Sequence, residues 1–113
     1  MTGHVVFPML GIDIVEISRI RRMLEKYGDH FLSRVFTPAE IDYARMKKNM
    51  DQCLAGRFAA KEAFIKASGK KPAFKDIEVL SDAGKPFIMY QGIRYDSVSI
   101  SHERSYAVSI VLC

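Results

Sequence analysis

Glu62 and Lys66, on one predicted helix, could place a carboxylate beside an ammonium group. A helix turns about 100° per residue, so side chains four positions apart lie one turn apart on the same face. The small residues Ala55 and Ala59 precede them on the same strip, where a ligand could approach the helix backbone. The pair is either an ordinary helix-stabilising ion pair or part of a ligand site.

A second acid, Asp13, interrupts an apolar segment in which an aliphatic residue would be expected. Burial of an unpaired carboxylate is costly, so its side chain must reach water, hydrogen-bond donors or a cation. Exposure at a strand end would satisfy this requirement. The alternative is a hard cation such as Mg²⁺, which prefers oxygen ligands and commonly uses only one or two protein carboxylates with water and substrate phosphate.

Other polar residues could bind an anion. Arg57 and Lys61 form a basic strip on the other side of the apolar stripe of the same helix. This strip is either a solvated face or a phosphate-binding surface. Ser101 and His102 end a strand in which hydroxyl-bearing residues alternate with apolar ones. His102 has either a structural role or a ligand contact.

The pattern of expected helices and strands is typical of an α+β fold. Residues 5–14 are rich in β-branched and aliphatic residues and should form a buried strand. Apolar residues at helical spacing then predict an amphipathic helix over residues 17–27, followed by a glycine that stops it. The opposite face of that helix is basic and includes Arg19, Arg22 and Lys26.

Two further helices are expected, and the longer one carries most of the candidate residues. Thr37-Pro38-Ala39-Glu40 is a capping box that predicts a helix over residues 38–48. Asp51 should cap a long helix over residues 51–68, which Gly69 ends. The apolar residues of the long helix that should face the core are Leu54, Phe58 and Ile65.

The last third of the chain is rich in strand-forming residues. Residues 77–80 and 87–90 flank a turn-forming segment and predict a hairpin, and residues 97–101 and 106–112 alternate as a second strand pair. No repeat or linker divides the sequence. We therefore expect a single domain over residues 1–113, with an antiparallel sheet packed against a long helix and shorter helices.

Composition narrows the function classes. The 113 residues are 49% hydrophobic and 27% charged, which is typical of a globular protein and excludes a disordered chain. Neither a membrane-spanning segment nor a signal peptide is expected, which favours the cytoplasm. Two cysteines without metal-site or redox spacing support neither a zinc site nor a redox motif, and we expect buried or idle thiols. The net charge of +4 favours an anionic partner: nucleic acid, a membrane face, a phosphorylated molecule or an acidic protein.

Two other classes of protein compete with an enzyme. A small nucleic-acid-binding domain would explain the basic charge and the exposed arginines, and a structural oligomeric subunit would explain the strands rich in valine and isoleucine. Neither explains an acid in the first strand or the Glu62 and Lys66 pair beside alanines. We expect no nucleic-acid or membrane partner.

Three sequence blocks, in chain order, resemble the holo-acyl-carrier-protein synthase family of phosphopantetheinyl transferases. They are GIDIVEI at residues 11–17, RFAAKEAFIKA at 57–67, and SISH at 99–102 with YAV at 106–108. Family-like connectors, RVFTPAE at 34–40 and GKP at 84–86, lie between them. Many relatives have a glycine-rich turn after the long helix, whereas residues 68–71 here contain one glycine and two lysines.

The resemblance implies transfer of the 4′-phosphopantetheine of coenzyme A to a serine of apo-acyl carrier protein, in support of fatty acid biosynthesis. It implies that Asp13 and Glu62 bind Mg²⁺ and that Lys66 lies near the pyrophosphate. Glu62, directly or through water, is the candidate base, and Lys66 would stabilise the leaving phosphate. The residues expected to contact coenzyme A are Arg57, Lys61, Lys66, Ser101 and His102.

The resemblance also implies a homotrimer with active sites between subunits. Carrier proteins are typically acidic, so the basic face formed by Arg19, Arg22 and Lys26 is expected to dock them.

Overall fold

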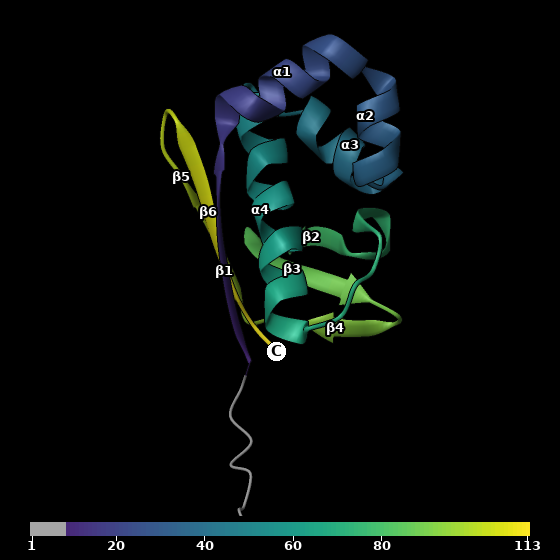
Figure 1. Ribbon diagram of the computed structural model, residues 1–113, viewed down its shortest axis with the longest axis vertical. Helices are drawn as coiled ribbons and strands as arrows, with labels where there is room; N and C mark the ends of the chain where they lie inside the picture. Colours follow the sequence, from purple (N-terminus) through teal and green to yellow (C-terminus); the bar gives the residue numbers. More distant parts are fainter. Residues whose placement is uncertain (1–8) are drawn as a thin grey trace, which may run out of the picture.

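The computed structural model describes residues 9–113. A long central helix, α4 (Met50–Ser68), has an antiparallel sheet against one side. The strand order of this sheet is β1 (Leu10–Glu16), β6 (Tyr106–Leu112) and β5 (Val98–His102). Figure 1 shows this sheet nearly edge-on beside α4. The two edge strands, β1 and β5, are therefore separated by β6.

Side chains of this sheet alternate between α4 and the outer surface. In β1, Gly11 and Val15 are buried toward the helix, whereas Ile12 is 55% and Ile14 64% exposed. The prediction of a buried strand is therefore confirmed for one face and wrong for the other, because α4 covers only one of them. The first part of that predicted strand, residues 5–8, lies outside the described residues.

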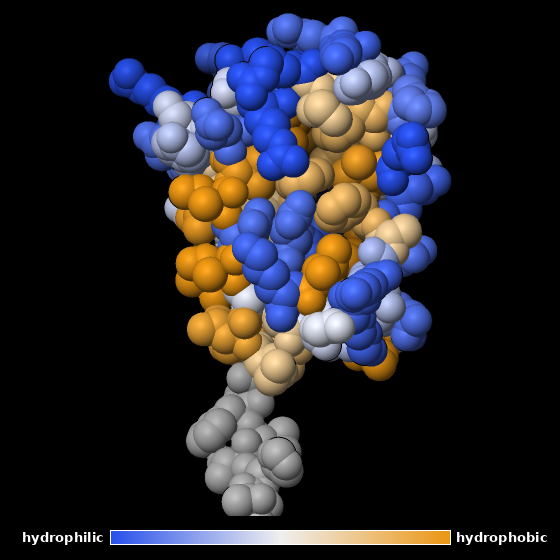
Figure 2. Space-filling model, in the orientation of Figure 1, coloured by the Kyte–Doolittle hydropathy of each residue, from blue (hydrophilic) through white to orange (hydrophobic). Residues whose placement is uncertain are grey.

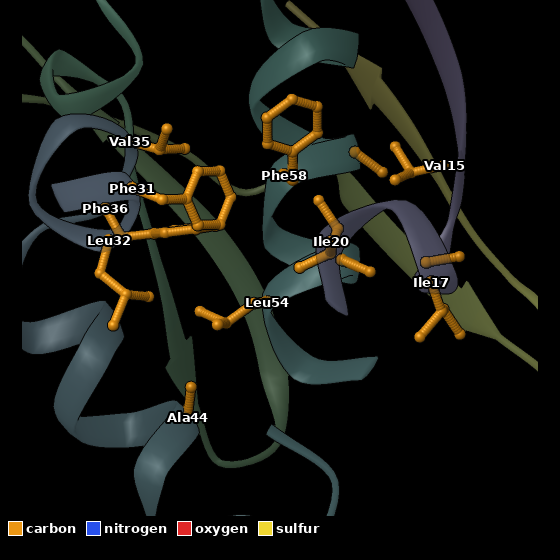
Figure 3. Packing of buried hydrophobic residues seen from close by; sticks show 13 residues of the cluster. Val15, Ile17, Ile20, Phe31, Leu32, Val35, Phe36, Ala44, Leu54 and Phe58 are labelled. Carbon is orange, nitrogen blue, oxygen red and sulfur yellow. The ribbon is translucent and has the colours of Figure 1, made fainter. Parts of the chain in front are cut away.

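Three short helices pack over the first half of α4. They are α1 (Ile17–Tyr27), α2 (Asp29–Val35) and α3 (Pro38–Arg45). Figure 3 shows their apolar side chains meeting those of α4, with Ile20, Phe31 and Leu54 pointing into one shared cluster. Helix α2 was not predicted from the sequence, because it has only two turns and follows the Gly28 stop directly.

Of the two predicted helix N-caps, the structure confirms one and contradicts the other. The capping box of α3 is confirmed: Thr37 Oγ1 accepts from the Glu40 N–H at 3.3 Å, and Glu40 Oε1 accepts from the Thr37 N–H at 2.8 Å. The prediction that Asp51 caps α4 is wrong, because the helix begins at Met50. Asp51 instead forms an ion pair with Arg21 at 2.7 Å, which joins α4 to α1.

A second antiparallel sheet covers another side of α4 and completes the fold. It consists of β2 (Glu78–Asp82), β3 (Lys85–Tyr90) and β4 (Ile93–Tyr95), in that order. The expected hairpin is confirmed, and its turn is tighter than predicted: only Ala83 and Gly84 connect the strands, both with positive φ. Such two-residue turns match the twist of hairpin strands. The three-residue strand β4 is too short for its sequence pattern to predict.

Strand β1 approaches α4 very closely at Gly11. A Cβ atom at this position would lie 1.9 Å from the Ala63 carbonyl oxygen and 2.7 Å from the Ala67 amide nitrogen. Both are backbone atoms of α4, so neither can move without shifting the helix. Gly11 therefore allows β1 to lie directly on α4 and fixes the position of Asp13, two residues further along the strand.

We expect Gly11→Ala to destabilise the protein by about 3 kcal/mol, the upper part of the range for overpacked cores. Thermal unfolding should show a fall in Tm of roughly 10 °C or more. Gly56→Ala is the matched control, because its Cβ would meet one side-chain atom, Ile100 Cγ2, at 2.9 Å and no backbone atom of another element within 4 Å. A side chain can shift without moving a whole element, and alanine favours the helix. Equal losses for the two variants would contradict this account.

Candidate active site

Asp13 and Lys66 meet where β1 crosses α4. Lys66 Nζ donates to Asp13 Oδ1 at 3.0 Å and to the Ile12 carbonyl oxygen at 3.1 Å. Lys66 thus forms its ion pair with Asp13 and not with Glu62, one turn earlier on its own helix. The alternative of an ordinary ion pair between Glu62 and Lys66 is therefore wrong, because the strand brings a second carboxylate to the same place.

Glu62 belongs to the same cluster. Partial burial and the negative charge of Asp13 raise the pKa of Glu62, and the positive charges of Arg19 and Lys66 oppose the increase. Two carboxylates that repel each other in a partly desolvated position favour a cation between them. This site is therefore electrostatically unlike an ordinary exposed helix surface.

The donor set fits a hard divalent cation that is also bound by a phosphorylated substrate. Asp13 and Glu62 provide oxygen ligands, and within residues 9–113 no cluster of three or more Asp, Glu, His or Cys side chains forms a complete metal cage. Mg²⁺ is commonly held in this way, by one or two carboxylates, with water and substrate phosphate completing its coordination. Zinc, which takes three or four protein ligands including His or Cys, fits less well.

The alanines beside Glu62 have a different role from the one expected. Ala55 and Ala59 are fully buried in the cluster that contains Val15 and Ala107 of the sheet. Their small side chains admit the strands of the protein itself. The expectation that a ligand approaches the helix backbone along this strip is therefore wrong.

Lys61 is also placed differently from the prediction. Its side chain is fully buried, and Nζ forms an ion pair with Glu40 Oε1 at 2.7 Å. Burial lowers the pKa of Lys61, while the charge and hydrogen bond of Glu40 oppose the change. The predicted coenzyme A contact from Lys61 is contradicted by this geometry, because its ammonium is surrounded by protein acceptors. Those are Glu40 and the carbonyl oxygens of Val35, Phe74 and Ile77.

Arg57 lies in a cleft of about 360 Å³ between the first half of α4, the end of α3 and strand β5. The residue is only 7% exposed, and its Nη2 donates to Ser81 Oγ at 3.3 Å. Its buried Nε has no hydrogen-bond partner among the described residues. A buried guanidinium with unused donor capacity suits an anionic group, and phosphate is the ligand that such forks bind well.

Tyr43, Lys47 and Lys48 also line this cleft, and none of the three was predicted as a site residue from the sequence. The Arg57 guanidinium lies 4.1 Å from the Tyr43 ring centroid and Lys47 Nζ lies 4.6 Å from it. A hydrogen bond with Ser81, another with Lys47, and the positive charges of Arg57 and Lys47 lower the pKa of Tyr43. The Lys47-Lys48 pair at the end of a predicted helix was the available signal.

Ser101 and His102, at the end of β5, lie on opposite faces of the sheet. His102 pairs with the inward-facing Ala107 and lines the Arg57 cleft. Ser101 pairs with Val108 and lies on the outer face of the sheet. The structure therefore brings His102, but not Ser101, to the cleft within one protomer.

The basic face of α1 is exposed as expected. Arg19, Arg22 and Lys26 lie within one stripe of the helix surface, because they are three or four residues apart. Arg19 is close enough to influence the pKa of Glu62, and its guanidinium lies 5.6 Å from the Phe58 ring centroid.

Beside this stripe is a groove of about 490 Å³ with basic and aromatic lining. Its lining residues are Arg19, Met23, Tyr27, His30, Phe31, Arg34, Val35, Phe58 and Phe74.

Comparisons with known proteins show the family to which the chain belongs. Residues 9–111 match the model of the 4′-phosphopantetheinyl transferase superfamily. The holo-[acyl-carrier-protein] synthase of Halothermothrix orenii is 48% identical, with 91% of this chain and 94% of that protein covered. The chain therefore belongs to the holo-[acyl-carrier-protein] synthase family of this superfamily.

Solved structures show the same α+β fold. The holo-(acyl-carrier-protein) synthase of Bacillus anthracis, in complex with CoA (3′,5′-ADP), is 39% identical with a TM-score of 0.80, covering 92% of this chain and 93% of that chain. The Helicobacter pylori enzyme, in complex with coenzyme A, is 32% identical with a TM-score of 0.81, covering 93% of this chain and 100% of that chain. Among the described helices of the present chain, none has the length and apolar character required to span a bilayer.

Proposed function

We propose that this chain transfers the 4′-phosphopantetheine group of coenzyme A to a serine of apo-acyl carrier protein, with Mg²⁺, in support of fatty acid biosynthesis in the cytoplasm. The observation that carries the proposal is the meeting of Asp13, Glu62 and Lys66 at the crossing of β1 and α4. Family membership and the coenzyme A complexes of related proteins support the same reaction.

The roles of the residues follow from their chemistry. Asp13 and Glu62 would hold Mg²⁺, which when bound neutralises pyrophosphate charge and polarises the phosphorus that is attacked. The serine oxygen forms a bond to the β-phosphorus, and the bond from that phosphorus to the bridging oxygen breaks. Glu62 takes the serine proton, and its raised pKa suits a general base. Lys66 stabilises the negative charge left on adenosine 3′,5′-bisphosphate.

The basic cleft would hold the nucleotide end of coenzyme A. Arg57, Lys47 and Lys48 supply positive charge, and His102 lies at the cleft wall. This cleft opens beside β5, whereas Asp13 lies on β1, at the opposite edge of the same sheet. Glu62 and Arg57, five residues apart on α4, point in directions about 140° apart. One protomer therefore presents the two halves of the site on different sides.

A homotrimer would join these halves between neighbouring subunits. Figure 2 shows apolar side chains on the edge of the molecule where Figure 1 places the β1–β6–β5 sheet. An apolar face of this kind favours association. A cyclic arrangement would bring the β1 edge of one subunit to the β5 edge of the next. The most exposed large apolar residues of this outer face are Leu10, Ile12, Ile14, Tyr106, Ile110 and Leu112.

Subunit mixing tests this arrangement. Glu62→Gln and Arg57→Ala should each be inactive alone. Trimers assembled from equal amounts of the two variants should recover about a quarter of wild-type activity, because one in four interfaces then has both halves of the site intact. Mixing Glu62→Gln with Asp13→Asn is the control, since both changes affect the same half. Recovery in the control, or none in the first mixture, would contradict a shared site.

Carrier docking on α1 gives a separate kinetic prediction. Reversing the charge of Arg19 and Arg22 to glutamate should raise the KM for the carrier more than the KM for coenzyme A, because an acidic carrier then meets like charge. Lys75→Glu, an exposed change outside α1, should alter neither KM by more than a small factor. Steady-state kinetics with each substrate varied in turn distinguishes these outcomes. Equal effects on both KM values would argue against this docking face.

The reaction itself is tested by mass spectrometry of the carrier. Wild-type protein, coenzyme A, apo carrier and Mg²⁺ should give a carrier that has gained one phosphopantetheine, and EDTA should prevent the gain. No gain with several carriers would refute the proposed function. Salt-sensitive binding to random DNA without any transfer would instead favour the nucleic-acid-binding alternative.

A further inference from the structure

Lys66 occupies the solvent side of the carboxylate that would bind the cation. Its ammonium contacts Asp13 Oδ1 at 3.0 Å and the Ile12 carbonyl oxygen at 3.1 Å. The Asp13 side chain is 13% exposed, whereas the Lys66 side chain is 55% exposed. The lysine therefore covers part of the accessible surface of Asp13 and remains in water itself.

This ion pair can be broken at low cost, unlike the other lysine pair of α4. Lys61 is held by Glu40 and three carbonyl oxygens in a fully buried position. Lys66 has two acceptors and a half-exposed, flexible side chain, and such pairs contribute little to stability. A pyrophosphate beside it would compete strongly for the ammonium, because it carries more negative charge than a single carboxylate.

We propose that Lys66 is a resident counterion of Asp13 that competes with a divalent cation for this carboxylate, and that the coenzyme A pyrophosphate releases it. This inference rests on the proposed function, because it uses the same cation and the same substrate. When Lys66 turns toward the pyrophosphate, Asp13 loses its ammonium partner and gains affinity for the cation. The cation and coenzyme A therefore bind cooperatively, and by linkage each raises the affinity for the other.

The charges around Asp13 support a specific effect of this lysine. Arg19 also influences Glu62 electrostatically, but it has no ion pair with Asp13. Loss of Lys66 should therefore favour cation binding mainly in the absence of coenzyme A. A general effect of positive charge would act equally with and without the substrate.

The test is Mn²⁺ binding to wild type and Lys66→Met, measured by electron paramagnetic resonance of free Mn²⁺. Without coenzyme A, Lys66→Met should bind Mn²⁺ about two- to fivefold more tightly, the range that corresponds to a partly exposed ion pair. With saturating coenzyme A, the difference in Mn²⁺ affinity between wild type and Lys66→Met should shrink. The ratio of the Mn²⁺ dissociation constant without coenzyme A to that with coenzyme A should therefore be smaller in the variant than in wild type. Lys66→Arg should behave like wild type, because a guanidinium can retain the pair with Asp13.

Lys75→Met is the charge-matched control, since Lys75 is exposed on the short 3₁₀ segment Phe74–Asp76 and should leave the Mn²⁺ affinity unchanged. An unchanged or weakened affinity in Lys66→Met, with a wild-type circular dichroism spectrum, would overturn the counterion role. Equal tightening with and without coenzyme A would also overturn it. Transfer by the wild type is measured separately by carrier mass, so failure of the counterion role is distinguishable from failure of the proposed function.

Discussion

Replacement of Glu62 by glutamine, or of Asp13 by asparagine, is expected to lower kcat/KM for phosphopantetheine transfer by about 10²–10³-fold, because a bound metal supplies several kcal/mol of transition-state stabilisation. Both changes keep the size of the side chain and remove one negative charge. Glu62→Gln also removes the proposed base. The rate is measured from the mass of the carrier at early times, with coenzyme A below its KM.

Asp42→Asn provides the matched control for these two variants. Asp42 is an exposed acid on α3, so its loss changes the net charge equally but should leave the rate within about twofold of wild type. Circular dichroism should show that all three variants are folded. Near-wild-type transfer by both Glu62→Gln and Asp13→Asn would refute their assignment to the site.

Lys61→Met should destabilise the protein by about 3–5 kcal/mol, the cost of leaving one partner of a buried ion pair uncompensated. Glu40 would keep its hydrogen bonds from the amides of Thr37 and Val79 but would lose the opposite charge. Several carbonyl oxygens around the ammonium would lose their donor at the same time. Urea unfolding measures the change directly.

The same variant separates a structural role of Lys61 from a coenzyme A contact. Where the variant is still folded, its KM for coenzyme A should be close to that of wild type. Lys75→Met, an exposed change of the same type, should alter stability by about 0.5 kcal/mol or less. A raised KM without loss of stability would restore the original assignment of Lys61 to the substrate site.

Local signals predicted much of the architecture. The capping box of α3, the glycines that end α1 and α4, and the alternation in β6 each depend on neighbouring residues only. The missed elements, α2 and β4, are too short for periodicity to be distinctive. Asp51 was misassigned because its partner, Arg21, is distant in sequence.

The candidate site could be predicted only in part, for the same reason. Asp13 stood out because an acid in an apolar segment requires an explanation, and Glu62 stood out because it lies one helical turn from Lys66 beside small residues. The pairing of Lys66 with Asp13 depends on how β1 crosses α4, which helix geometry alone does not contain. Lys61 looked exposed on a helical wheel, yet α3, the 3₁₀ segment and β2 close over it. The cleft residue Tyr43 was missed because its neighbours come from separate elements.

The central claim is that the Asp13 and Glu62 cluster supports transfer from coenzyme A to a carrier protein. The most direct measurement follows both products of one reaction: modified carrier by mass spectrometry, and adenosine 3′,5′-bisphosphate by chromatography. The account predicts that the two form in equal amounts with Mg²⁺ and that neither forms in EDTA or with Glu62→Gln. Release of the nucleotide without modification of the carrier, or equal transfer by Glu62→Gln, would contradict it.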